Sequence, residues 1–372
     1  MERLRKLYPD PVILFCLILL FLMGLLAIVS VRVAPYIAAD LTLYHFKRPF
    51  LFALAFVAGL LIMSFTSHAL NYRAMNNQRF VYGLVSLSII LLLVVLFKKI
   101  LMGKAVDRWL VGSSIQPSEF SKLILVIFIS YYVSRKGYIR RLRFFGWAIL
   151  IVIIHSFLLF LQPDKGMAIF IMIVAWLMLW IGGTSPKVYL PVGGLFTLVG
   201  TFMIIFGGDY VARRLTAWQD PVSDPFGSSY QVIQSLLAFM NGGLLGQGYG
   251  KGFQKLGPLT QADTDYILAV IGEELGLGGI LFLFLLFGVL LWRLKRIALE
   301  TSDTFGRMVV VGVTLNILLA VLINTMMAVN LLPPKGMPLP FVSYGISHLI
   351  ASLIGLGIVG AIYKRQLYMK ML

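Results

Sequence analysis

Four carboxylates lie within or beside one apolar stretch of the chain: Asp263, Asp265, Glu273 and Glu274. The residues between and around them are of the kind found in membrane spans. A carboxylate in lipid is costly, by roughly 2.5–3.5 kcal/mol at the centre of a membrane helix. Such groups persist where they have a partner or a chemical task, so this stretch is the first candidate for a functional site.

Helical geometry predicts different roles for these carboxylates. On a helix that begins near Asp265, the small residues Ala269, Gly272 and Gly276 share its face and leave room for a ligand or a neighbouring helix. Glu274 points nearly the opposite way, so it is not predicted to form a carboxylate pair with Asp265. Asp265 lies at the outer mouth of the predicted span, where it can stay ionised and act as a base. Glu273 and Glu274 lie about two turns deeper and are predicted to be structural.

Two basic residues near other spans need an explanation of their own. Lys122 falls inside a predicted span, and Glu119 three residues earlier or Glu273 and Glu274 are candidate partners. A structural ion pair between Glu119 and Lys122 is the favoured interpretation. Arg108 lies closer to the outer surface and is the better candidate for binding a ligand.

Two proline-containing segments interrupt the apolar pattern. In the turn 162–166, Asp164 either caps the following helix or orients a basic residue in the site. The segment 333–345 separates the last two spans, and irregular backbone at membrane depth is tolerated only where it is buried in protein or lines a cavity. We therefore expect this segment to line a cavity, and we expect Lys335 to project into that cavity.

The glycine-rich run 246–252 looks like a phosphate-binding loop but matches no known template. Lys251 is followed by Gly252 rather than by Ser or Thr, and no strand precedes the run. Two interpretations stay open: a flexible turn at the membrane surface, or backbone amides that act with Lys251 on a phosphate group.

The composition is that of a membrane protein that crosses the bilayer several times. Of the 372 residues, 59% are hydrophobic and 13% are charged, against roughly half and a quarter in soluble domains. The net charge of +17 is better explained by basic cytoplasmic loops than by nucleic-acid binding. The single cysteine, Cys16, excludes a disulfide or a cysteine-based metal site within the chain.

Apolar windows of about 20 residues predict an all-α integral membrane domain that spans residues 1–372. Clusters of Lys and Arg fall on one side of the membrane if the number of spans is even, so both termini are predicted to be cytoplasmic. The ten predicted transmembrane helices are 11–33, 49–67, 80–97, 118–134, 144–161, 166–183, 188–207, 265–292, 307–331 and 345–363.

One large extracytoplasmic loop, about 208–264, joins the seventh and eighth predicted spans. Loops longer than about 15 residues are usually functional or disordered. This loop is rich in aromatic residues, so we expect it to fold against the membrane domain with short amphipathic helices.

Together these motifs resemble the SEDS family (shape, elongation, division and sporulation), which comprises the bacterial FtsW and RodA proteins. The resemblance covers almost the whole chain. It is carried by Arg108-Trp109, Gln116-Pro117-Ser118-Glu119, Gln162-Pro163-Asp164, Gly166, Arg213 or Arg214, Tyr230-Gln231, Gly242-Gly243, Gly246-x-Gly248, Gln254-Lys255, Thr264-Asp265, Ile271 to Gly276, Pro334-Lys335-Gly336, Leu339-Pro340 and Ser343-Tyr344-Gly345.

The resemblance implies a peptidoglycan glycosyltransferase that polymerises lipid II at the outer leaflet of the bacterial cytoplasmic membrane and releases undecaprenyl diphosphate. Asp265 matches the family's catalytic residue and would act as the general base. The residues implied to bind the diphosphate or sugar are Arg108, Arg213, Arg214, Lys335, Lys251 and Gln254. The residues implied to support the site are Asp164, Lys122, Glu119, Glu273, Glu274 and Ser343.

The family also implies partners: membrane lipids, the lipid II substrate and a class B penicillin-binding protein that acts as transpeptidase, with no nucleic acid. No metal ligands are assigned, and a divalent cation, Mg or Mn, stays open as a cofactor. The spacing from Gly246 to Asp265 and the run Gln254-Lys255-Leu256 favour FtsW, and hence division, over RodA and elongation. The alternatives are a lipid II flippase and a non-catalytic scaffold for a transpeptidase.

Several residues depart from the family pattern. Asp263 replaces the usual His two residues before the catalytic Asp, and Gly257 replaces a Glu that is common in FtsW proteins. Lys165 replaces a Leu and Ile346 a Gly. Asp263 brings a second acidic group close to Asp265, and like charges raise the pKa of one member of such a pair.

Overall fold

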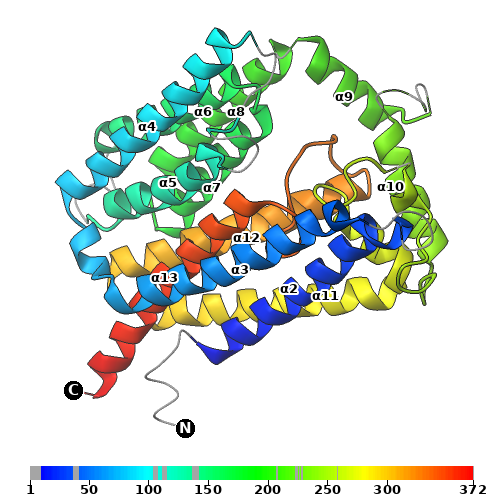
Figure 1. Cartoon of the computed structure of the whole chain (residues 1–372). Coiled ribbons are helices and arrows are strands. Elements are labelled where there is room, and N and C mark those ends of the chain that lie inside the picture. The colour runs from blue at the N-terminus through cyan, green and yellow to red at the C-terminus, as the bar shows by residue number, and fades with distance from the viewer. Residues whose placement is uncertain are drawn as a thin grey trace.

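The computed structural model describes residues 10–36, 42–103, 108–110, 115–135, 142–206, 208–222, 225, 227, 229–257 and 259–371. Twelve helices are found in this part of the chain, and the numbering of Figure 1 is kept for them. They are α2 (Pro11–Arg32), α3 (Leu43–Ala69), α4 (Gln78–Leu101), α5 (Pro117–Val133), α6 (Leu142–Leu161), α7 (Lys165–Ile181), α8 (Pro186–Ile205), α9 (Asp209–Gln219), α10 (Tyr230–Gly242), α11 (Ile267–Glu300), α12 (Thr304–Ala328) and α13 (Ile346–Met371).

Ten of these helices, α2–α8 and α11–α13, fall where the apolar windows predicted spans. Seven of them are long and apolar enough to cross a membrane: α2, α3, α4, α8, α11, α12 and α13. The apolar parts of α6 (Gly146–Leu161) and α7 are shorter, and α5 has 17 residues. The described chain is therefore an all-helical protein with several membrane spans.

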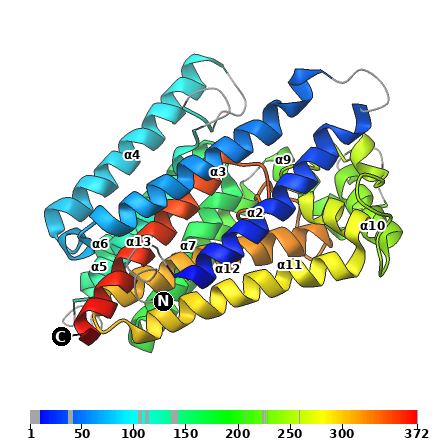
Figure 2. The same cartoon turned by 60° about the horizontal axis from the view of Figure 1, so that its bottom comes forward.

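The helices form a bundle in which α12 is central. It packs against α5, α7, α11 and α13, while α2 lies on α11 and α3 packs closely along α13. Figures 1 and 2 show the start of α2 and the end of α13 near the same end of the bundle, with α10 at the opposite end.

The long loop folds as expected. It contributes the helices α9 and α10, and α10 packs against α11. Buried side chains of this region form a small second apolar cluster: Ala238, Leu259, Ala262, Tyr266, Ala269, Val270 and Met327. The loop is thus attached to the membrane helices by apolar packing at the end of the bundle that carries Asp265.

The expectation of a continuous helix from Asp265 through Gly276 is wrong. Helix α11 begins only at Ile267, and it is interrupted at Gly276, which has φ 65° and ψ −164°. A Cβ on Gly276 would lie 2.4 Å from the backbone nitrogen of Gly246. The break allows a close approach of the glycine-rich loop, so Gly276 does not continue a helical face that begins at Asp265.

Candidate active site

Asp265 lies in the turn just before α11, and α12 holds this turn in place. The side-chain amide of Asn324 donates to the carbonyl of Asp265 and to that of Met337, each at 2.8 Å. The side chain of Asp265 is half-buried. It lines a cavity of about 370 Å³, here called the aspartate cavity. Its lining includes Arg108, Gln116 and Tyr344. One buried amide therefore fixes both the turn that carries Asp265 and the proline-rich segment that contains Met337.

The carboxylate of Asp265 has no hydrogen-bond or ion-pair partner among the residues that the structure describes. Gly336 lies against it, since a Cβ on this glycine would come within 3.1 Å of Oδ2 of Asp265. Burial raises the pKa of Asp265 to about 6, and the nearby negative charge of Asp263 adds to the effect. The positive charges of Arg214, Arg108 and Lys335 oppose this rise. A carboxylate with free lone pairs and a raised pKa is suited to accept a proton.

Asp263 is clamped between two arginines. Arg32 donates from Nε and Nη2 to its two carboxylate oxygens, each at 2.8 Å. Nη1 of Arg48 lies 2.8 Å from Oδ2 and 3.1 Å from Oδ1. Burial alone would raise the pKa of Asp263, but the hydrogen bonds and charges of the two arginines hold it below its usual value. The residue that departs from the family pattern is therefore a fixed negative charge, and the predicted like-charge effect on Asp265 is present.

Arg108, Arg214 and Lys335 line a second cavity of about 370 Å³, whose walls are mainly apolar. We call it the apolar cavity; residues such as Ile169, Phe170 and Met203 belong to its walls. Arg108, Asp164 and Gly336 line both this cavity and the aspartate cavity, so the two adjoin. The structure thus brings three of the predicted anion-binding residues to one place beside Asp265.

Arg108 is held by the turn between α6 and α7. Its Nη2 donates to the carbonyl of Pro163 at 2.7 Å, and its Nη1 lies 3.7 Å from Oδ1 of Asp164. Nε of Arg108 is buried and has no hydrogen-bond partner among the described residues. An unpaired buried donor is costly and is expected to be satisfied by a ligand or water.

Lys335 extends along the wall of the apolar cavity, as expected. A Cβ on Gly166 would come within 1.9 Å of its Cε, so the glycine makes room for the lysine side chain. Nζ lies 5.8 Å from the centre of the Phe170 ring. Burial lowers the pKa of Lys335 to about 7, although the charge of Asp164 acts in the opposite direction.

Asp164 performs both of the roles that were open. It caps α7 by accepting a hydrogen bond from the backbone N–H of Met167 at 3.4 Å. It also lies beside Arg108 and accepts a hydrogen bond from Nε2 of Gln116 at 3.1 Å. The start of α7 and the start of α5 are joined through this one carboxylate.

The structural ion pair between Glu119 and Lys122 is confirmed, with 2.6 Å between Oε2 and Nζ. His348 completes the cluster, because its Nδ1 lies 2.8 Å from the same oxygen. Glu119 and His348 also line the aspartate cavity, so this buried group forms part of its floor.

Glu273 and Glu274 make structural contacts, in agreement with the prediction. Glu273 accepts hydrogen bonds from the backbone N–H groups of Phe253 and Gln254, at 3.0 and 3.1 Å. Glu274 forms a buried ion pair with Lys255 and accepts a hydrogen bond from Ser30 at 2.5 Å.

The glycine-rich loop uses its amides within the protein. Gln247 N–H donates to the carbonyl of Glu273 at 2.9 Å and Gly248 N–H to that of Glu274 at 3.0 Å, next to the break in α11. Lys251 is exposed and Gln254 is buried, and neither lines a cavity together with Asp265. These observations favour the interpretation as a turn, while the roles of Lys251 and Gln254 in substrate binding stay predictions.

The neighbouring residues Arg213 and Arg214 are placed differently from each other. Arg213 is exposed, whereas its neighbour Arg214 lines the apolar cavity. Ser343 is buried and supports the turn that carries Asp265, since its hydroxyl donates to the carbonyl of Thr264 at 2.5 Å and accepts from the N–H of Leu339 at 2.8 Å.

Sequence reasoning did not place Arg32, Arg48 or Asn324 beside Asp265. Arg32 and Arg48 are charged residues at the ends of apolar spans, and Asn324 is a polar residue inside one, so each gave a signal. Their partners lie far away in the sequence, which is why the pairs could not be predicted. In the described part of the chain, no group of three or more His, Cys, Asp or Glu side chains comes together as a metal site would require.

Comparison with known families identifies the chain. The family of FtsW, RodA and SpoVE, described as cell cycle proteins, matches residues 10–368. The chain belongs to this family. The motif resemblance read from the sequence is thereby confirmed.

Curated FtsW and SpoVE relatives match most of the chain. A probable peptidoglycan glycosyltransferase FtsW of Trichlorobacter lovleyi is 36% identical over 323 residues, which cover 85% of this chain and 82% of the relative. The stage V sporulation protein E of Bacillus subtilis is 35% identical over 366 residues, covering 95% and 97% of the two chains.

Solved structures have the same fold. A chain described in work on the coordination of polymerisation and crosslinking by a peptidoglycan synthase complex is 26% identical, with a TM-score of 0.74 over 97% of this chain and 99% of that one. The rod shape determining protein RodA of Thermus thermophilus is 24% identical, with a TM-score of 0.66 over 97% and 98%. The latter likeness concerns the fold alone.

Proposed function

We propose that this protein is a peptidoglycan glycosyltransferase that joins lipid II molecules into glycan strands at the outer leaflet and releases undecaprenyl diphosphate. Membership of the family and the names of the curated FtsW relatives support this activity. The observation that carries it is the Asp265 carboxylate, which faces a cavity without a partner among the described residues and has three cationic side chains nearby.

In this reaction Asp265 accepts the proton of the acceptor sugar hydroxyl. The hydroxyl oxygen then forms a bond to the anomeric carbon of the donor, and the bond from that carbon to the diphosphate oxygen breaks. Arg108, Arg214 and Lys335 stabilise the negative charge on the leaving diphosphate. The walls of the adjoining apolar cavity suit the lipid chain of the donor. Arg213, Lys251 and Gln254 are further proposed contacts on the outer side.

We also propose ten spans in one membrane domain, residues 1–372, with both termini in the bacterial cytoplasm. The ten helices at the predicted positions support this topology, with α5, α6 and α7 as the three shorter spans. In it, α9 and α10 lie on the outer face together with Asp265, where the substrate is presented.

The names of the curated relatives favour a role in division over one in elongation. A class B penicillin-binding protein is the proposed partner. The similar chain from work on a peptidoglycan synthase complex that polymerises and crosslinks supports this pairing.

The experiment is polymerisation of lipid II by the purified protein, with and without the transpeptidase. We expect Asp265→Asn to reduce the rate by at least about 100-fold, the lower end of what a general base contributes. Asp220→Asn is a matched control, because Asp220 is an exposed carboxylate at the end of α9.

Two outcomes would contradict the proposal. Lipid II that crosses a reconstituted bilayer without polymer formation would point to a flippase. An Asp265→Asn protein that fails to polymerise but fully rescues cells lacking the wild type would point to a scaffold.

A further inference from the structure

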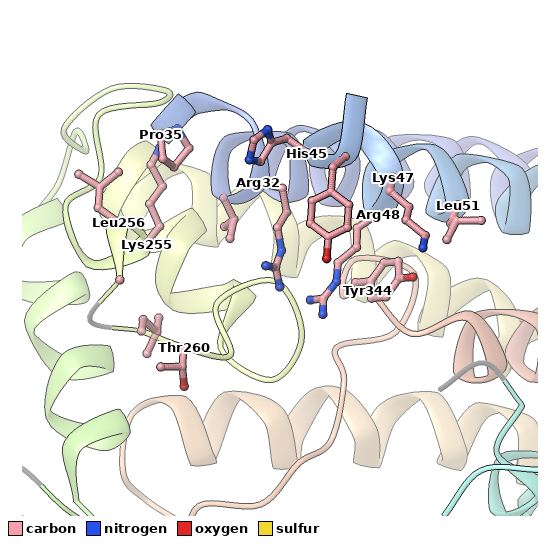
Figure 3. A pocket seen from close by; sticks show the side chains of 14 residues that line it. Arg32, Pro35, His45, Lys47, Arg48, Leu51, Lys255, Leu256, Thr260 and Tyr344 are labelled. Carbon is pink, nitrogen blue, oxygen red and sulfur yellow. The ribbon is translucent and has the colours of Figure 1, made fainter. Parts of the chain in front are cut away.

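A third and larger cavity lies beside the catalytic turn and has no role in the reaction as described so far. Its volume is about 580 Å³, and it is bounded by the end of α2, the start of α3 and residues 255–257, 259 and 260 (Figure 3). We call it the basic cavity, after the side chains of Arg32, Lys47, Arg48 and Lys255 that line it.

The charge of the basic cavity is positive even after its ion pairs are counted. Its lining among the described residues contains four Lys or Arg side chains and no Asp or Glu. Asp263 compensates for one charge of the arginine pair, and Glu274 pairs with Lys255. Two positive charges remain, which favours an anionic ligand.

Several donors in this cavity remain available to a ligand. A guanidinium group has five N–H donors. Asp263 engages Nε and Nη2 of Arg32 and Nη1 of Arg48, so further N–H groups of both arginines are left. Figure 3 shows the two guanidinium groups close together beside Tyr344. Lys47 is exposed and has no ion-pair or hydrogen-bond partner in the described part of the chain.

The basic cavity differs from the apolar cavity in the kind of group it suits. Its lining is mainly polar, with His45 and Thr260 among the uncharged contributors, so it offers little wall to a lipid chain. Its volume lies in the range of sites that hold a whole small ligand rather than a single ion. Arg48 and Tyr344 line both this cavity and the aspartate cavity, so a ligand here reaches the reacting centre.

We propose that the basic cavity binds the hydrophilic, anionic part of a second lipid II molecule through its oxyanion groups. This inference rests on the proposed function, in which two substrate molecules meet at Asp265. The oxyanions in question are the carboxylates of the peptide that the sugar carries or the diphosphate of the second molecule. The polar lining and the size of the cavity favour the peptide.

The test measures binding to the purified full-length protein by calorimetry. One probe is the soluble disaccharide-peptide, which has free carboxylates but neither lipid nor diphosphate. A second is the same molecule with its carboxylates amidated, and a third is inorganic diphosphate. The variants are Lys47→Glu, Lys47→Gln and Lys47→Arg, with Lys187→Glu as the matched control, since Lys187 is an exposed lysine at the start of α8.

We expect Lys47→Glu to weaken binding of the carboxylate probe about tenfold and Lys47→Gln about threefold, in line with the loss or reversal of one exposed charge contact. Lys47→Arg should stay within about twofold of wild type, because the positive charge is kept. Lys187→Glu should have no effect, and the amidated probe should bind weakly to every variant.

If the carboxylate probe does not bind but inorganic diphosphate binds and depends on Lys47 in the same way, the site stands and the diphosphate is its ligand. If neither anion responds to Lys47→Glu and Lys47→Gln, or the amidated probe binds as well as the acid, the proposal is overturned. Neither measurement needs turnover, so Asp265→Asn protein must give the same binding. Lys47-dependent binding without any polymerisation would therefore refute the proposed function but not the anion site.

Discussion

Asp265 can accept a proton only while it is ionised, and burial raises its pKa to about 6. The rate of polymerisation should therefore fall as the pH is lowered through about 6. In the proposed reaction Lys335 binds the leaving diphosphate while it is protonated, and burial lowers its pKa to about 7. The rate should also fall as the pH rises through about 7, which gives a bell-shaped profile of kcat/KM.

The Lys335→Arg variant separates the two limbs. Arginine stays protonated at every accessible pH, so the alkaline limb should disappear while the acidic limb stays near 6. An alkaline limb that persists in Lys335→Arg protein would show that another group titrates there.

Asp263 affects the site through its charge and its two arginines. Replacing it by Asn removes a negative charge near Asp265 and leaves Arg32 and Arg48 uncompensated. Both changes favour the ionised form of Asp265, so the acidic limb of the profile should move to lower pH in Asp263→Asn protein. The free energy of unfolding should fall by about 1–2 kcal/mol, less than for a fully buried pair because both arginine side chains are partly exposed.

Asp10→Asn is the matched control for this prediction. Asp10 is also a buried carboxylate that pairs with an arginine, Arg293. It caps the start of α2, whereas Arg32, the partner of Asp263, lies at the end of α2. We expect its loss to lower the melting temperature without moving the acidic limb. Equal shifts in both variants would exclude a specific effect of Asp263 on Asp265.

At the scale of the elements, the break in α11 depends on Gly276. Its φ is positive, and a Cβ there would lie 2.4 Å from the backbone nitrogen of Gly246, so no side chain fits. Gly276→Ala should therefore destabilise the protein by about 1–3 kcal/mol, as for other residues forced into a glycine-only conformation. Gly288→Ala in the same helix is the control: a Cβ there meets no atom within 4 Å, and alanine favours helix by up to about 1 kcal/mol. Thermal melting of both variants in detergent would measure the difference.

The elements also show what the sequence could predict. Spans such as α2 and α12 were predicted to within a few residues, because a long apolar window defines a membrane helix almost by itself. The break at Gly276 was not predicted. Helical propensity does not show that backbone carbonyls of a distant loop accept the hydrogen bonds that the interrupted helical turn cannot form. Leu277 N–H, for example, donates to the carbonyl of Gly243 at 3.0 Å.

The same limit applies to the candidate site. Glu119 and Lys122 were paired correctly because they are three residues apart on one helix. The partners of Asp263 are 231 and 215 residues away, and only the packed bundle brings them together.

At the scale of the whole molecule, the proposed topology places Leu245 outside the cell and Ser302 inside. Cys16 is fully buried, so the wild-type chain should react poorly with a membrane-impermeant maleimide. Leu245→Cys, at a side chain that is 91% exposed, should be labelled in intact spheroplasts. Ser302→Cys should be labelled only after the membrane is permeabilised, and the reverse pattern would invert the proposed orientation.

The wall between the aspartate cavity and the basic cavity includes Arg48 and Tyr344, which line both. A ligand in one cavity that draws the Arg48 guanidinium toward itself changes the electrostatic field in the other cavity. Thermodynamic linkage makes such an effect mutual, so each ligand alters the affinity for the other by the same factor. The saturation curve of this enzyme should therefore depart from a simple hyperbola, and the departure should shrink in an Arg48→Gln variant.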